Sequence, residues 1–332
     1  MSRIRYTVRR LAQTLPVLVG ITSITFFLIH TMPGDPVEVM LGPTASEELI
    51  AQARAQYGFD EPLHIQYLSY LWSAAQGDLG TSLHYGVPVT TKILERLPVT
   101  LLLLASSFTF ALGVAIPLGI LAAKRRKKPA DHLSRVLSLV GVSTPNFWIG
   151  LVLIILFTYR LDLLPATGLV LPWRPPSEVS GAQTSLDVVV ASLRTLVMPT
   201  IALGTLQMAA IARIERSSML EVLNQEYIGL ARAFGISERT ILRKHAFKNA
   251  QLPVVTIVSL QLTSSLGGAV LTETVFNING MGRLIIQAIR AQDFPLVLGT
   301  TLFFGFMFVI GTLITDLVYG YLDPRVTYEG AN

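Results

Sequence analysis

The hydrophobic residues of this chain gather into long uninterrupted stretches. Stretches of at least 18 residues without Asp, Glu, Lys or Arg occur six times. A helix needs about 20 apolar residues to cross a bilayer core of about 30 Å. In the strands of a membrane barrel apolar and polar residues alternate with period two, and these stretches show no such alternation. They predict six transmembrane helices in an all-α integral membrane protein. The stretches are Leu11–Gly34, Leu97–Ala123, Val136–Tyr159, Thr195–Ala212, Asn249–Thr272 and Phe294–Thr315.

The expected spans divide the chain into alternating inner and outer segments. We place the spans at 11–31, 97–123, 136–159, 195–215, 251–273 and 294–322. The inner segments are then 1–10, 124–135, 216–250 and 323–332, and the outer ones are 32–96, 160–194 and 274–293. The first span is expected to be an anchor and not a cleaved signal peptide, because its apolar run is too long and no small-x-small site follows before Pro33–Pro36.

The basic residues set the orientation. Of the 26 Lys and Arg residues, 18 fall in or next to segments on the side of the N-terminus and 8 on the other side. Cytoplasmic loops carry such an excess, so both termini are expected in the cytoplasm of a cell whose inner membrane holds the protein. The run 124–128, all Lys or Arg, fits an anchor at an anionic lipid surface.

Composition agrees with a membrane protein. The chain is 51% hydrophobic and 14% charged, with a mean hydropathy of +0.55, whereas soluble domains carry nearer a quarter charged residues. The excess of Lys and Arg in the inner segments accounts for the net charge of +5. The charge therefore gives no reason to expect a nucleic-acid partner. Cysteine is absent, which excludes disulfides and thiolate chemistry.

The first outer segment, 32–96, is long enough to hold its own helices. Ser46 is placed to cap a helix that Gly58 ends, and Pro62 suits the start of a second. A short third helix is expected near 88–96. Together they predict a helical cap on the outer face, whereas 160–194 is rich in Pro, Gly and Ser and is expected to be mostly loop.

The inner segment 216–250, which we call the elbow, has a helix–glycine–helix pattern. Apolar residues recur at helical spacing from Leu220 to Phe234, and Gly235 then suits a C-cap. Ser237 can cap the next helix, which runs on to Pro253. The elbow presents small residues and a basic edge that includes Arg232 and Arg239.

Several kinds of chemistry are missing. None of the six lysines follows a glycine, so no phosphate-binding loop of the Gly-Lys-Ser/Thr kind exists. The five histidines are scattered and show no metal-binding spacing, so no catalytic residue, metal or cofactor is expected. Ionisable residues lie only at the edges of the spans, which argues against an ion-coupled transporter and favours one powered from outside.

At the elbow the sequence resembles a known family. The stretch Glu226–Gly235, continuing to Leu252 and Pro253, is similar to the cytoplasmic loop of ATP-binding-cassette importer permeases. Further motifs resemble the first permease subunit of the dipeptide/oligopeptide (peptide/nickel) branch. They are Pro33–Pro36, Gly77–Ser82, Arg216–Leu223, Asn249–Val255 and Leu271–Phe276. Two departures from the general family, Gly229–Ala231 in place of Glu-Ala-Ala and a long interval from Gly235 to Pro253, fit that branch.

The resemblance implies a type I importer permease that forms half of a translocation pathway. Its partners would be a second, homologous permease subunit, two ATPase subunits and a periplasmic or lipid-anchored solute-binding protein. The ATPase would contact the elbow at Glu226, Gly229, Ala231, Arg232, Ala233, Gly235 and Arg239. Acidic residues of the cap could meet the binding protein, namely Glu47, Glu48, Asp60, Glu61 and Asp78. Polar residues of the spans could line the path, namely Asn146, Gln207, Gln261, Ser264 and Ser265.

Other functions stay open at this stage. The same machinery carries nickel chelates, glutathione or oligosaccharides in close relatives, and the partner permease could be a second copy of this chain. An intramembrane enzyme would need an Asp pair, a Ser-His set or a metal motif, none of which is present. A scaffold would leave the elbow unexplained.

The basic asymmetry makes a topology prediction. A tag fused after Asn332 should be cytoplasmic, whereas a single cysteine placed near Gly77 should react with an impermeant thiol reagent added outside intact cells. The absence of native cysteines keeps the background low. Access to both sites from the same face of the membrane would contradict six spans.

Overall fold

The computed structural model describes the backbone of residues 3–31, 34–42 and 44–322. Within this part the secondary structure is helical, and extended pairing is limited to one bridge between Thr81 and Pro88. Two units can be distinguished, 1–100 with 279–310 and 101–278 with 311–332. The expected tail 323–332 and Pro33 of the first motif lie outside the described residues.

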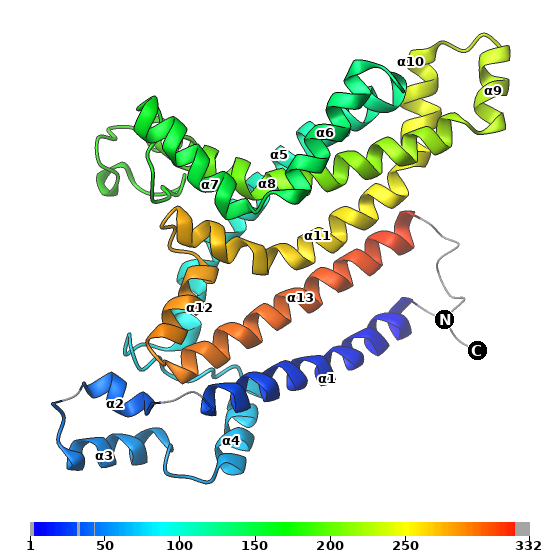
Figure 1. Ribbon diagram of the computed structural model, residues 1–332. Helices are drawn as coiled ribbons and strands as arrows, with labels where there is room; N and C mark the ends of the chain where they lie inside the picture. Colours follow the sequence, from blue (N-terminus) through cyan, green and yellow to red (C-terminus); the bar gives the residue numbers. More distant parts are fainter. Residues whose placement is uncertain (1–2, 32–33, 43, 323–332) are drawn as a thin grey trace. The chain divides into compact units, whose positions relative to one another are not determined.

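The first unit holds the N-terminal helices and the helices that follow residue 279 (Figure 1). The predicted caps of its third helix are confirmed, because Ser46 Oγ accepts a hydrogen bond from the Leu49 amide and Gly58 is left-handed with φ +72°. The next helix starts directly after Pro62, also as predicted. The helices are α1 (Arg3–His30), α2 (Pro36–Leu41), α3 (Glu47–Tyr57), α4 (Leu63–Ala75), the start of α5 (Val89–Lys124), α12 (Met281–Arg290) and most of α13 (Phe294–Leu322).

Asp293 ties this unit together. Its buried carboxylate accepts hydrogen bonds from Ser82 Oγ, from the His84 amide and from the Leu296 amide at the start of α13. Such a cap is worth about 0.5–2 kcal/mol to a helix. The apolar core beside it joins α1, α5, α12 and α13 through Phe26, Ile29, Val89, Ile93, Met281, Leu284, Ala288, Phe294, Leu296, Val297 and Leu298.

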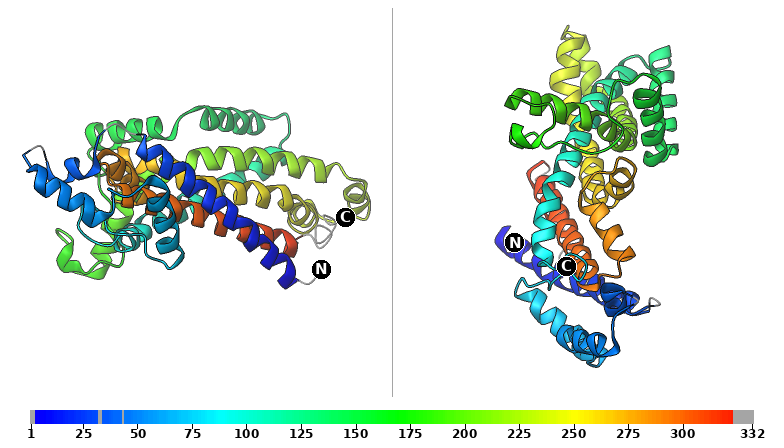
Figure 2. Two further views of the ribbon diagram at one scale, coloured as in Figure 1. Left: turned by 90° about the horizontal axis from the view of Figure 1, so that it is seen from below. Right: turned by 90° about the vertical axis from the view of Figure 1, so that its left-hand side faces the viewer.

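The second unit is built around two long helices, α8 (Ser185–Leu223) and α11 (Phe247–Val275). They lie side by side in Figure 1 and again in Figure 2, and they share the buried cluster of Ile211, Ala212 and Val254. The remaining elements are the rest of α5, α6 (Pro129–Ser143), α7 (Asn146–Ile154), the π-helix η1 (Ile155–Arg160), the 3₁₀-helix η2 (Pro176–Glu178), α9 (Glu226–Ala233), α10 (Glu238–Thr240) and the π-helix η3 (Ile241–Ala246).

The interval 136–159, expected to be one span, contains two helices. α6 and α7 are bent by 101° with respect to each other. The break lies at Thr144 and Pro145, both extended, because proline lacks the amide hydrogen that a helix needs and keeps the residue before it out of the α region.

Two other expected boundaries also differ. α8 begins at Ser185, ten residues before the expected span, because Thr184 and Asp187 form a capping box that the Pro- and Gly-rich context obscured. The short helix expected near 88–96 is the first part of α5, which runs unbroken from Val89 to Lys124.

Some of the described helices have the length and hydropathy of a membrane span. In the described part of the chain four helices are long and apolar enough to cross a membrane, or five if the bent pair α6–α7 is one span. They are 13–30 within α1, α5, α8 and 294–315 within α13. α11 covers the expected fifth span, but the side chains at 263 and 266–268 lie outside the described residues.

Close helix packing in the second unit depends on small residues. A Cβ atom on Gly204 of α8 would stand 2.9 Å from the backbone oxygen of Ser107 and 2.7 Å from the ring of Phe110, both on α5. A backbone oxygen inside a helix cannot move aside easily, so only glycine fits here. Small residues are common at helix interfaces in membranes for this reason.

Gly204→Ala should therefore destabilise the protein by roughly 1–3 kcal/mol through overpacking. The matched control is Gly113→Ala on α5, where an added Cβ meets no atom within 4 Å. That change should be neutral or stabilising by up to about 1 kcal/mol, because alanine is the better helix former. Thermal unfolding in detergent measures both, and a Tm for Gly204→Ala at or above that of Gly113→Ala would contradict the packing argument.

Candidate functional site

The elbow, 216–250, contains a short helix, α9, which lies between two breaks in the helical backbone. α8 ends at Leu223, and Gln225 is extended, so the helix expected from Leu220 to Phe234 is interrupted before α9 begins at Glu226. At its other end Gly235 is left-handed, with φ +76°. There the Ile236 amide donates to the Ala231 carbonyl at 3.1 Å, which closes α9 in the manner of a Schellman turn.

α9 has a buried inner face. Ile228 is fully buried and packs with Ala231 and Ile241, and Leu223 and Ile236 border the same cluster. The inner face therefore joins the end of α8 to η3. It fixes α9 to α8 and to η3, which continues into α11.

The outer face of α9 is apolar and exposed. Tyr227 is 42% exposed, Leu230 58% and Phe234 77%. They follow one another at helical spacing, and Leu230 and Phe234 point away from Ile228. The Tyr227 hydroxyl accepts a hydrogen bond from Asn249 Nδ2 of α11 at 3.0 Å. The sequence analysis used these residues to predict the helix and did not recognise that they form its exposed face.

The seven residues expected to contact an ATPase fall on both faces. Ala231 lies on the inner face and packs within the unit. The others are exposed, namely Glu226, Gly229, Arg232, Ala233, Gly235 and Arg239. Arg232 Nε donates to Glu238 Oε1 at 2.7 Å, so the basic edge is bound in part to the elbow itself.

Polar contacts hold the base of the elbow, and the sequence analysis missed them. Arg216 of α8 binds Asp131 of α6, and Ser218 Oγ donates to the Ala250 carbonyl of α11 at 2.7 Å. Glu215, fully buried, accepts from Gln251 Nε2 at 3.0 Å. These partners are far apart in sequence, so no local periodicity indicates them.

Three of the five polar residues expected in the spans are brought together. Gln207 of α8 is buried and donates to Ser265 Oγ of α11 at 2.9 Å, and Ser265 in turn donates to the Gln261 carbonyl. Ser264 is exposed and also donates to that carbonyl, whereas Asn146 lies at the start of α7. Helix-to-helix bonding therefore accounts for Ser265 and for the Nε2 group of Gln207, whereas Gln207 Oε1 is buried without a hydrogen-bond partner among the described residues.

The five acidic residues expected to meet a binding protein are all exposed, namely Glu47, Glu48, Asp60, Glu61 and Asp78. Three of them have local roles. Glu47 and Glu48 lie in the first turn of α3, where a carboxylate suits the helix dipole, and Asp78 Oδ1 accepts from the Gly80 amide at 2.9 Å.

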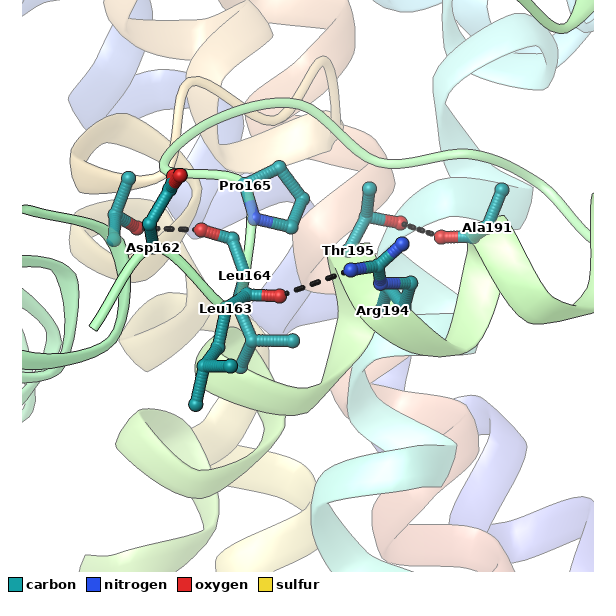
Figure 3. A pocket seen from close by; sticks show the side chains of 8 residues that line it. Asp162, Leu163, Leu164, Pro165, Ala191, Arg194 and Thr195 are labelled. Atoms are coloured by element: carbon teal, nitrogen blue, oxygen red, sulfur yellow. Dashed lines mark hydrogen bonds between the residues drawn. The ribbon is translucent and has the colours of Figure 1, made fainter. Parts of the chain in front are cut away.

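An open pocket of about 380 Å³ lies between the end of η1 and α8 (Figure 3). Its polar groups hold the loop after η1, because Arg194 Nη2 donates to the Leu163 carbonyl at 3.1 Å and Thr158 Oγ1 donates to the Leu164 carbonyl at 2.8 Å. The lining residues are Thr158, Asp162, Leu163, Leu164, Pro165, Ala191, Arg194 and Thr195.

The apolar helices of membrane length define a helical membrane protein, and its elbow presents an exposed apolar face. Comparison with known sequences gives its family. Residues 115–328 match the binding-protein-dependent transport system inner membrane component, and residues 3–105 match the N-terminal model of such components. The chain belongs to this family of membrane transport components, and it is a permease and not an enzyme.

Relatives match almost end to end. The dipeptide transport system permease protein DppB of Alkalihalophilus pseudofirmus is 40% identical over 97% of this chain and 99% of its own length. DppB of Escherichia coli K12 is 38% identical over 98% and 99%. The oligopeptide transport system permease protein AppB of Bacillus subtilis is 38% identical over 97% and 99%.

Proposed function

We propose that this chain is the first permease subunit of an ATP-driven peptide importer in the bacterial cytoplasmic membrane. The substrate class is supported by the names of its relatives, which transport dipeptides or oligopeptides. The family name requires a solute-binding protein as partner. A second, homologous permease completes the pathway, and two ATPase subunits supply the energy.

In this proposal the chain crosses the membrane six times, with both termini in the cytoplasm. The excess of Lys and Arg on one side supports the orientation. Five spans follow if α6–α7 counts as one, and α11, a helix of 29 residues, supplies the sixth. The elbow then lies in the cytoplasm and the helices α2, α3 and α4 lie outside, where their exposed acidic residues meet the binding protein.

The observation that carries the proposal is the outer face of α9. Leu230 and Phe234 are large, apolar and exposed on a helix outside the proposed spans. A helix can bind a partner by laying such a face into a groove, which removes the apolar area from water. Docking through this face explains why the inner face, with Ile228, is fixed to α8 and η3.

Leu230→Asp should release the ATPase, because it sets a charge in an apolar contact. Burying one leucine is worth about 1.5–3 kcal/mol, so binding should weaken at least about tenfold. Leu230→Met, which conserves volume, is the matched control and should bind normally. Co-purification with ATPase subunits, at equal membrane levels of the permease, measures this. Equal recovery of ATPase with both variants would refute docking through this face.

Gly235→Val should block transport without loss of the protein from the membrane. A β-branched residue at φ +76° costs more than about 1–2 kcal/mol in backbone strain, and relief of that strain tilts α9. Gly113→Ala on α5 is the control, because it has ordinary helical geometry, an added Cβ meets nothing within 4 Å, and it lies outside the expected ATPase contact. Uptake of labelled alanyl-alanine beside quantified membrane levels decides, and normal uptake by Gly235→Val would contradict transmission through α9. If nickel chelates, glutathione or oligosaccharides enter and the peptide does not, the proposed substrate is wrong.

A further inference from the structure

A buried ion pair joins α6 to the part of α8 where the elbow begins. Arg216 Nε lies 2.6 Å from Asp131 Oδ1, and Arg216 Nη2 lies 3.1 Å from Asp131 Oδ2. The Asp131 side chain is 1% exposed and that of Arg216 is 19% exposed. The Asp131 carboxylate also accepts from the Lys127 amide at 2.9 Å, and Arg135 Nε is 3.7 Å away.

The geometry of this pair fixes direction as well as distance. Both oxygens of Asp131 face the fork of Arg216, which holds the two groups in one plane. Because the carboxylate is buried, losing its partner would leave an uncompensated charge. The two side chains therefore stay together when one of the helices is displaced.

Arg216 belongs to the same packed group as α9. It lies two turns before Leu223, the residue of α8 that borders the cluster of Ile228 and Ile241. Between them Ser218 is bonded to the backbone of α11, and Met219 packs with Ala246. A displacement of α9 is therefore passed to the end of α8, which carries Arg216, through this packed cluster as well as through the backbone break at Gln225.

Arg216 contacts α6 at the first turn of that helix. Asp131 lies at the start of α6, and Gly141, near its end, approaches Ala209 of α8 so closely that an added Cβ would stand 2.8 Å away. Beyond Gly141 the chain bends by 101° into α7. α6 is therefore attached to α8 at both ends, and the chain continues into α7 through Thr144 and Pro145.

We propose that the Asp131–Arg216 pair is the positioning contact that transmits displacement of α9 to α6. This rests on the proposed function, in which the ATPase moves α9. The pair touches no solute and acts through the helices that it joins. Loss of the pair uncouples the motions, so that ATP is still hydrolysed but α6 no longer follows α8.

The test measures uptake of labelled alanyl-alanine and release of phosphate in the same vesicles. These contain the whole complex with both permeases, its ATPase subunits and its binding protein. Asp131→Asn removes the charge with little change in size, and Arg216→Lys keeps the charge but loses the fork. Arg135→Ala is the matched control. Arg135 faces the same carboxylate, but its side chain is half exposed and its contact distance of 3.7 Å is longer than that of Arg216. The double variant Asp131→Arg with Arg216→Asp restores an ion pair between α6 and α8 with the two charges exchanged.

Asp131→Asn should lower the uptake per ATP hydrolysed by about tenfold and Arg216→Lys by about threefold, in the range of couplings between sites. Arg135→Ala should stay within about twofold, and the exchange should recover part of the loss. If the Asp131–Arg216 pair had only a structural role, its loss would lower uptake and ATP hydrolysis in proportion, and their ratio would not change.

An unchanged ratio of uptake to hydrolysis in both single variants would overturn the proposal. If Asp131→Asn does not assemble, the ratio for Arg216→Lys decides alone. Failure of the proposed function is visible separately, because Leu230→Asp would then retain its ATPase whatever the ratio for the Asp131 and Arg216 variants.

Discussion

The second unit depends on how the end of α8 is fixed to its neighbours. Within about one turn, Glu215, Arg216 and Ser218 bond to α11, α6 and α11 in that order. Each is a polar group removed from water, and a buried polar group is costly unless its partner is in place. The bonds therefore hold the helices in one arrangement, and α9 is attached where they converge.

Glycine residues allow the helices of this unit to approach one another closely. Gly204 lets α8 meet the backbone of α5, and Gly141 lets α6 meet α8. Apolar burial offers little direction between helices in lipid, so contact depends on shape and on the few polar bonds. Gly235 serves a different purpose, because its left-handed backbone turns the chain between α9 and α10.

The sequence predicts what is local. Apolar stretches indicate helices of membrane length, and Ser46, Gly58, Gly235 and Ser237 lie at helix ends as their residue types suggest. Family motifs were also recognisable, and the comparisons confirm the permease family.

What could not be predicted is long-range. Asp131 and Arg216 are 85 residues apart, and nothing at either position indicates the other. The side of α9 that is buried depends on where Ile241 packs, so Ala231 was expected on the docking face and lies on the inner one. The interval 136–159 was expected to be one span, and the bend at Pro145 was missed for a related reason, since a proline in a span can kink a helix or end it, depending on its neighbours.

The central claim, that the outer face of α9 meets an ATPase, is tested most directly by a photo-crosslinker at position 230 in the assembled complex in its membrane. The account predicts an adduct with the ATPase subunit. The same crosslinker at Leu186, which is 76% exposed at the other end of α8, should give none. An adduct from Leu186 and none from position 230 would contradict the account.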